Sequence, residues 1–246
     1  MLTQARGRQV VVHLSMLLAI GLLGGCVQRR AEVPAAEPVP VPPPPAAMAE
    51  DAVPAGARVY EIDPDASVVT LRVYRAGPFA RLGHNHVITS TGESGMAWVA
   101  AEPGQSGFVV RVPVAGLEVD DPAARAAAGQ DFPGEVPADA REGTRRNMLR
   151  PEVLDGDRYP EIVVRAAALG GTWESPVAEV RITLRSETRP LSVPLAIEVQ
   201  GNALVARGSF QVLQSEFGIT PFSVAGGAIQ VADPVEVAFE IRATAR

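Results

Sequence analysis

The stretch SVVTLRVY (residues 67–74) decides the fold class of this chain, because its residues alternate with a period of two. One face of an extended strand would carry Val69, Leu71 and Val73, and the other face Thr70, Arg72 and Tyr74. Successive side chains of a strand point to opposite faces, so this pattern predicts a strand with one buried face. The stretch GFVVRVPV (107–114) repeats the alternation, and Pro113 favours a strand edge or a bulge there.

Further alternating segments follow toward the C-terminus, separated by glycine, proline and aspartate. They lie at residues 161–169, 177–185, 191–200, 203–213 and 233–245. Gly201-Asn202 joins two of them and predicts a β-hairpin. The chain is therefore predicted to be all-β, with about eight antiparallel strands in a barrel or a sandwich, which the alternation alone does not separate.

Residues 121–150 interrupt the strands with a short helical excursion. Asp121 before Pro122 has the pattern of an N-cap followed by proline in the first turn. A second short helix is expected over residues 137–150, with Asp139 as its cap.

The N-terminal residues 1–25 have the pattern of a secretory signal. Arg6 and Arg8 precede an apolar run, and LLGGC (residues 22–26) resembles a bacterial lipobox. A transmembrane helix is the alternative, since 20 uncharged residues separate Arg8 from Arg29. The small residues before Cys26, the only cysteine, favour cleavage and lipidation of that residue.

Residues 26–57 follow as a lipidated cysteine and a tether rich in proline and alanine, and residues 58–246 form the globular domain. Proline-rich segments favour an extended, semi-rigid conformation, which suits a spacer between a membrane and a domain. The expected location is the bacterial cell envelope, on the periplasmic face. The residue that follows Cys26 is Val27 and not aspartate, which favours transport of the lipoprotein onward to the outer membrane. The formal charge of −6 excludes general nucleic-acid binding.

Four segments, in order, resemble the YceI-like family of exported bacterial proteins. They are YEIDPDAS (60–67), RRNMLRPEVLDGDRYPEIVVR (145–165), ITLRSETRPLSVPL (182–195) and GSFQVLQSEFGITPF (208–222). The resemblance implies a lipocalin-like β-barrel with a long apolar interior. It also implies an amphiphilic ligand with an isoprenoid tail, such as a polyprenyl compound or a quinone, and no further cofactor.

An isoprenoid tail has no hydrogen-bonding groups, so inward-facing apolar side chains are the chemistry it requires. The alternation predicts that six residues line this interior: Val110, Val112, Leu184, Ile197, Phe210 and Phe239.

His84 and His86 are two of the three histidines and are two residues apart. On a strand, both imidazoles would lie on one face. Three interpretations stay open: a polar corner at the barrel mouth, a contact to a ligand headgroup, and a metal site. Metal sites need three or four protein ligands, so a carboxylate such as Glu93, Glu61 or Asp63 would have to join them. The shortfall in ligands favours the first two interpretations.

Arginines 141, 145, 146 and 150 are spaced as neighbours on a helix and could clamp an anionic headgroup, or simply form a solvated face. Arg146 is taken with His84 and His86 as the predicted rim of the binding site. The expected function is non-enzymatic, a membrane-anchored carrier or sensor of an isoprenoid-like lipid. The alternatives are a metal-binding protein or metal-dependent enzyme that uses the histidine pair, and a structural envelope protein with a filled barrel.

Overall fold

A computed structural model describes residues 53–246 of the chain. The predicted signal segment, Cys26 and nearly all of the tether lie outside the described residues. The strands are β1 (Arg58–Ile62), β2 (Val68–Ala76), β3 (His86–Thr89), β4 (Ser94–Val99), β5 (Gly107–Pro113), β6 (Glu118–Val119), β7 (Glu161–Ala166), β8 (Leu169–Thr172), β9 (Ser175–Leu184), β10 (Glu187–Gln200), β11 (Ala203–Leu213), β12 (Ser223–Val224) and β13 (Ile229–Ala245).

Two α-helices lie between β6 and β7, α1 (Pro122–Ala127) and α2 (Ala138–Met148). Single turns of 3-10 helix, η1 to η5, occupy Ala80–Leu82, Pro103–Gln105, Val114–Gly116, Gln214–Phe217 and Ala225–Gly227. Among the described residues, no helix is long and apolar enough to cross a membrane.

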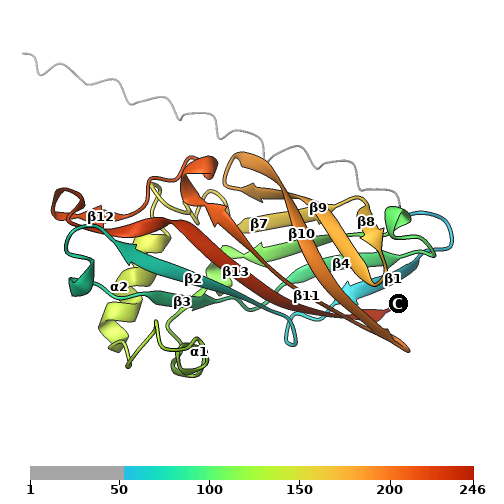
Figure 1. The fold of residues 1–246 in the computed structure, drawn as a ribbon, viewed down its shortest axis with the longest axis horizontal. Coiled ribbons are helices and arrows are strands. Elements are labelled where there is room, and N and C mark those ends of the chain that lie inside the picture. The colour runs from blue at the N-terminus through green and yellow to red at the C-terminus, as the bar shows by residue number, and fades with distance from the viewer. Residues whose placement is uncertain (1–52) are drawn as a thin grey trace, which may run out of the picture. The chain divides into compact units, whose positions relative to one another are not determined.

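The strands form one antiparallel sheet that closes on itself, as Figure 1 shows. The order β1-β4-β5-β7-β9-β10-β11-β13 closes through pairing of β13 with β1. β13 is long enough to pair with β1 near its C-terminus and with β2 along the rest of its length, and β3 and β6 continue from β2. The closed eight-strand barrel confirms the predicted fold class and decides against the sandwich.

The structure confirms two of the predicted local features, a hairpin and a helix cap, and corrects a third. Gly201-Asn202 forms the predicted tight hairpin, with Gln200 paired to Ala203. Asp121 caps α1 as predicted, because its Oδ1 accepts from the N–H groups of Ala123 and Ala124 at 3.0 and 2.9 Å. The predicted cap of α2 was wrong. Pro137 is the N-cap, and Asp139 lies in the first turn of the helix. Its carboxylate there interacts favourably with the partial positive charge at the helix N-terminus.

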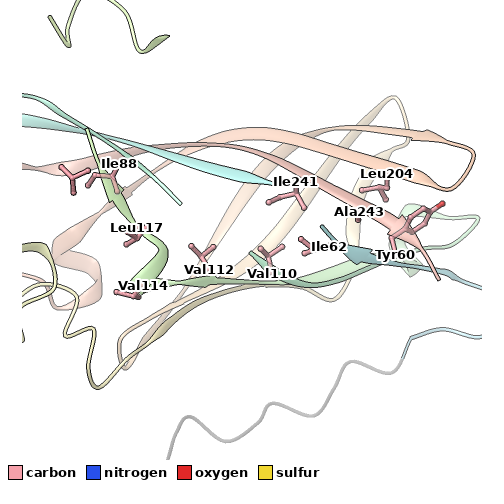
Figure 2. Close-up of a cluster of buried hydrophobic side chains, with 11 residues drawn as sticks. Tyr60, Ile62, Ile88, Val110, Val112, Val114, Leu117, Leu204, Ile241 and Ala243 are labelled. Carbon is pink, nitrogen blue, oxygen red and sulfur yellow. The ribbon is translucent and has the colours of Figure 1, made fainter. Parts of the chain in front are cut away.

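Inward-facing residues of alternate strand positions fill one end of the barrel. Figure 2 shows Tyr60, Ile62, Leu204, Ile241 and Ala243 gathered there. Tyr60 is 1% exposed. Outside this cluster, Arg58 donates from Nη1 to the Gly201 carbonyl at 2.9 Å and from Nη2 to Asn202 Oδ1 at 2.6 Å. This end lies beside the β10–β11 hairpin and is called the sealed end below, because its buried side chains pack together.

Candidate functional site

The barrel encloses an apolar cavity of about 180 Å³, called the inner cavity below. Its wall consists of the inward-facing residues of the long strands. Ser106 is the only hydroxyl-bearing residue in the lining, which contains no charged side chain among the residues that the structure describes. The Ser106 hydroxyl is already occupied, since it accepts from the Ala100 N–H at 2.9 Å and donates to the Glu102 carbonyl at 3.1 Å.

All six side chains predicted for the barrel interior line the inner cavity: Val110, Val112, Leu184, Ile197, Phe210 and Phe239. Phe210 and Phe239 come from neighbouring strands, β11 and β13, and their ring centroids are 6.3 Å apart. Phe239 lies directly over Gly208, where a Cβ atom would come within 2.6 Å of the ring. The glycine therefore leaves the space that this aromatic ring fills.

A second cavity of about 270 Å³, called the outer cavity below, lies toward the other end of the barrel. The two cavities share six lining residues, so they are adjoining parts of one space: Leu71, Leu117, Ile162, Leu184, Val212 and Phe217. The outer cavity also reaches His84 and Val224, which are exposed to solvent. The apolar interior therefore opens at this end, called the mouth below.

Polar groups line the outer cavity where the inner cavity has almost none. They are Tyr74, Arg75, His84, His86, Thr144, Asn147, Gln214 and Gln230. The Nη1 of Arg75 donates to the Gly83 carbonyl at 2.6 Å, and the Nε2 of Gln214 donates to the Ala232 carbonyl at 2.8 Å. The space is thus polarised, with an apolar interior and hydrogen-bonding groups near the mouth.

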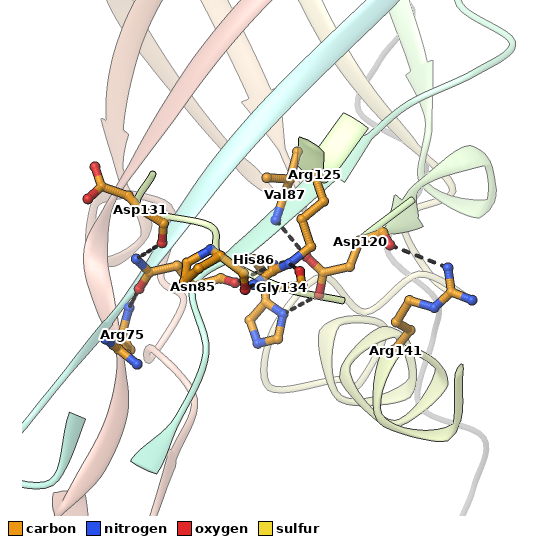
Figure 3. Close-up of polar contacts among 10 residues, drawn as sticks. Arg75, Asn85, His86, Val87, Asp120, Arg125, Asp131, Gly134 and Arg141 are labelled. Carbon is orange, nitrogen blue, oxygen red and sulfur yellow. Dashed lines mark hydrogen bonds and ion pairs between the residues drawn. The ribbon is translucent and has the colours of Figure 1, made fainter. Parts of the chain in front are cut away.

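His86 is held by a buried carboxylate, as Figure 3 shows. Its Nδ1 lies 2.6 Å from Oδ2 of Asp120, whose side chain is fully buried. The other carboxylate oxygen accepts from Arg125 Nη1 at 2.8 Å and from the Val87 N–H at 2.9 Å. Arg125 is 3% exposed. It also donates to the carbonyls of Asn85 and Gly134, each at 2.8 Å. The buried charge is therefore paired and hydrogen-bonded on all sides.

The environment of Asp120 keeps its carboxylate ionised. Burial raises its pKa, but hydrogen bonds from His86 and the Val87 N–H, with the positive charge of Arg125 and that of His86 when it is protonated, outweigh burial and hold the pKa below its usual range. An ionised carboxylate only accepts hydrogen bonds, so His86 carries a proton on Nδ1. Its Nε2 makes no hydrogen bond within the described part of the chain, and His86 lines the outer cavity, which leaves that nitrogen to meet a ligand.

The two histidines share the mouth but have different surroundings. Both line the outer cavity, and their ring centroids are 6.4 Å apart. Asn85 points away from them, since its Oδ1 accepts from the Arg75 N–H and its Nδ2 donates to the Asp131 carbonyl. Within residues 53–246, no group of three or more histidine, cysteine, aspartate or glutamate side chains is placed to hold a metal ion.

The carboxylate beside His86 was not among those that the sequence suggested. Glu93 is buried, and its Oε1 accepts from the Ser90 hydroxyl. Glu61 pairs with Arg246, and Asp63 accepts from the N–H groups of Asp65 and Ala66 in a turn. Asp120 follows β6, which has only two residues and is too short to show the alternating pattern that predicts a strand. The one available signal was its place directly before the cap residue Asp121.

The predicted rim arginine, Arg146, lines neither cavity. Its side chain is 67% exposed and faces Glu142 at 3.6 Å, as an i,i+4 pair on α2. Two other arginines of this helix bind backbone carbonyls: Arg141 donates to Asp120 at 3.3 Å, and Arg145 to Ala115 at 3.0 Å. These two attach α2 to the chain around β6, while Arg146 lies on the solvated face.

Comparison with known families identifies this architecture. The model of the YceI-like domain matches residues 60–243. The chain belongs to the YceI-like family. The match spans the whole barrel, from the first strand to the last, and confirms the family resemblance carried by the four sequence segments. A comparison with curated proteins finds no match.

Solved structures similar to this YceI-like barrel come from several bacteria. BcnA of Burkholderia cenocepacia is 16% identical, with a TM-score of 0.55 over 74% of this chain and 99% of that chain. A polyisoprenoid binding domain from Saccharophagus degradans, implicated in plant cell wall breakdown, is 12% identical, with a TM-score of 0.48 over 76% and 98%. The Campylobacter jejuni YCEI protein is 9% identical, with a TM-score of 0.47 over 65% and 84%. The likeness to BcnA shows a shared fold.

Proposed function

We propose that this protein binds an amphiphilic lipid with an isoprenoid-like tail, without catalysing a reaction. The observation that carries the proposal is the polarised cavity: an almost entirely apolar interior that continues into a mouth with hydrogen-bonding side chains. Such a space matches a molecule with a long apolar tail and one polar end.

The tail accounts for most of the binding free energy. Each buried methylene-sized group contributes roughly 0.8 kcal/mol, and the loss of tail flexibility opposes it. Affinity should therefore rise with tail length until the cavities are filled and then level off. The aromatic pair Phe210 and Phe239 supplies a large apolar surface to the tail.

The polar end of the lipid would lie in the outer cavity, near His86. Asp120 fixes the ring of His86, so Nε2 has a set direction without any ligand present. A neutral imidazole accepts a hydrogen bond from a hydroxyl through this nitrogen, and the protonated form donates to an oxygen. A hydroxyl- or carbonyl-bearing headgroup, such as that of a prenylated phenol or quinone, has the required chemistry.

The direct test is to purify the protein from bacteria, extract it with organic solvent and analyse the extract, then titrate polyprenyl compounds of increasing length. Val110→Phe fills the inner cavity and should abolish binding of the longer compounds. Val109 lies on the opposite face of the same strand and outside the cavity lining, so Val109→Phe is the matched control and should bind normally. An empty extract and no binding at any length would replace the carrier with a side-chain-filled structural barrel.

The proposal extends to location. A lipidated Cys26 and a proline-rich tether would hold the barrel on the periplasmic face of the envelope, at the outer membrane. Support comes from the sequence LLGGC behind an apolar run. A carrier or sensor of membrane lipid acts where its ligand resides, and a tether about thirty residues long permits the barrel to reach the bilayer surface.

A further inference from the structure

Two loops that surround the mouth carry large apolar side chains in solvent. The first loop contains η1 and connects β2 to β3, and the second contains β12 and η5 and leads into β13. Phe79 on the first loop is 49% exposed, Leu82 64% and Val224 on the second loop 43%. These three residues are called the apolar crown below.

The two loops are attached to each other, so the crown is one surface. The Phe79 N–H donates to the Ala228 carbonyl at 2.8 Å. Gly77 packs so closely against this loop that a Cβ atom would lie 2.8 Å from the carbonyl oxygens of both Gly227 and Ala228. Figure 1 shows the loops at the same end of the barrel as α2, away from the β10–β11 hairpin.

The charge around the crown differs from that of the whole chain. The chain has a formal charge of −6, yet neither residues 75–85 nor residues 218–232 contain an aspartate or a glutamate. The first stretch contains Arg75 and Arg81, both exposed. Within the described residues, Arg81 makes no ion pair. These two loops thus form a local surface of apolar and basic side chains on an acidic protein, with exposed Asp131 of the neighbouring loop joined to Asn85 through its backbone carbonyl.

We infer that the apolar crown docks the mouth on an anionic lipid bilayer. Exposed apolar side chains enter the boundary between headgroups and acyl chains, and arginines beside them pair with anionic headgroups. The crown continues into the outer cavity through Val224. A docked barrel therefore places the opening of its apolar interior against the bilayer, where a lipid can pass without its tail crossing water. This goes beyond the proposed function, because it names a second membrane contact that does not require Cys26.

The test uses residues 53–246, which lack the anchor, and vesicles of phosphatidylglycerol mixed with phosphatidylcholine. We expect this part to fold on its own, since it contains every strand that the structure places in the closed barrel and 99% of the BcnA chain matches 74% of this one. The barrel should sediment with these vesicles and bind pure phosphatidylcholine more weakly. Phe79→Ser with Leu82→Ser should weaken binding at least about tenfold, and Arg81→Gln about fivefold on anionic vesicles only.

Val199→Ser is the matched control. Val199 is 44% exposed, close to the 43% of Val224, but lies beside the hairpin at the sealed end, so its substitution should leave vesicle binding unchanged. No binding to either vesicle would overturn the inference, as would an equal loss from Val199→Ser. A dimer in sedimentation velocity that Leu82→Ser dissociates would assign the crown to a second copy of this chain and also overturn it. Binding to vesicles by a barrel that yields no lipid on extraction would support the crown while refuting the lipid carrier.

Discussion

Replacing Asp120 with asparagine should destabilise the barrel strongly, because the change removes one buried charge and keeps the shape. Asp120 has a φ of 52°, in the left-handed region that aspartate and asparagine tolerate better than most residues. The substitution therefore leaves the backbone intact. It leaves Arg125 buried without a carboxylate and takes from His86 the group that orients its ring.

The expected loss is about 3 kcal/mol of the free energy of unfolding. Breaking a buried ion pair by removing one partner costs roughly 3–5 kcal/mol, since the other charge stays buried and uncompensated. The lower end of this energy range applies here, because the asparagine side-chain oxygen can replace Oδ1 of Asp120. That oxygen accepts hydrogen bonds from the Val87 N–H at 2.9 Å and from Arg125 at 2.8 Å. In a domain of this size, about 3 kcal/mol lowers the melting temperature by roughly 10 °C.

Urea unfolding followed by circular dichroism measures the change, with Asp121→Asn as the control. Asp121 is the neighbouring residue and a helix cap, a position where asparagine serves about as well as aspartate, so this variant should lie within about 0.5 kcal/mol of the wild type. Asp120→Asn combined with Arg125→Met should recover part of the loss, because the orphaned charge is gone. A loss below about 1 kcal/mol in Asp120→Asn, or an equal loss in the control, would refute the reasoning.

The pH dependence has a definite sign. The folded-state pKa of Asp120 lies below the ordinary aspartate value of 3.8. Its contribution is therefore present above that value and is lost as pH falls toward the folded pKa. The stability gap between wild type and Asp120→Asn should narrow as pH falls below about 4. A gap that widens below pH 4 would contradict the assignment.

Three other predictions concern separate features. Gly208→Ala should destabilise the barrel by about 1–3 kcal/mol, because the new Cβ would lie 2.6 Å from the Phe239 ring and 2.9 Å from the Pro194 carbonyl; an unchanged urea midpoint would contradict this. The barrel should retain less than stoichiometric zinc after dialysis against a mild chelator. Stoichiometric zinc in the wild type that is lost when His84 and His86 are both replaced by alanine would instead support a metal site. Cys26→Ser should abolish incorporation of a fatty-acid probe, so equal labelling of wild type and variant would exclude lipidation at that residue.

The inward face of the barrel was predictable from the sequence. A strand with a period of two has only two choices of face, and burial of the apolar one fixes the register of every side chain. Six residues chosen from alternation in five different strands therefore reached the same cavity. The hairpin at Gly201-Asn202 and the cap at Asp121 were predictable for a similar reason, since each is a local preference of two or three residues.

Contacts between distant segments could not be predicted in this way. Barrel and sandwich have the same alternation, and the difference is the pairing of β13 with β1, the last and first strands of the barrel. The pairing of His86 with Asp120 joins residues 34 positions apart and depends on where β6 meets β3. Arg146 failed to reach the cavity because its position on α2 depends on which face of the helix Arg141 and Arg145 attach to the barrel.

The arrangement of charge along the barrel gives the lipid proposal a direction. At the sealed end, buried Tyr60 packs with apolar neighbours. At the mouth, Asp120 binds His86 and Val87 of β3 through its side chain, and its carbonyl accepts from Arg141 of α2. The same residue therefore fixes the headgroup-facing imidazole and the helix beside it. A lipid that enters from a docked mouth would go in tail first and stop when its headgroup meets His86. Loss of Asp120 would then disturb headgroup orientation more than tail burial.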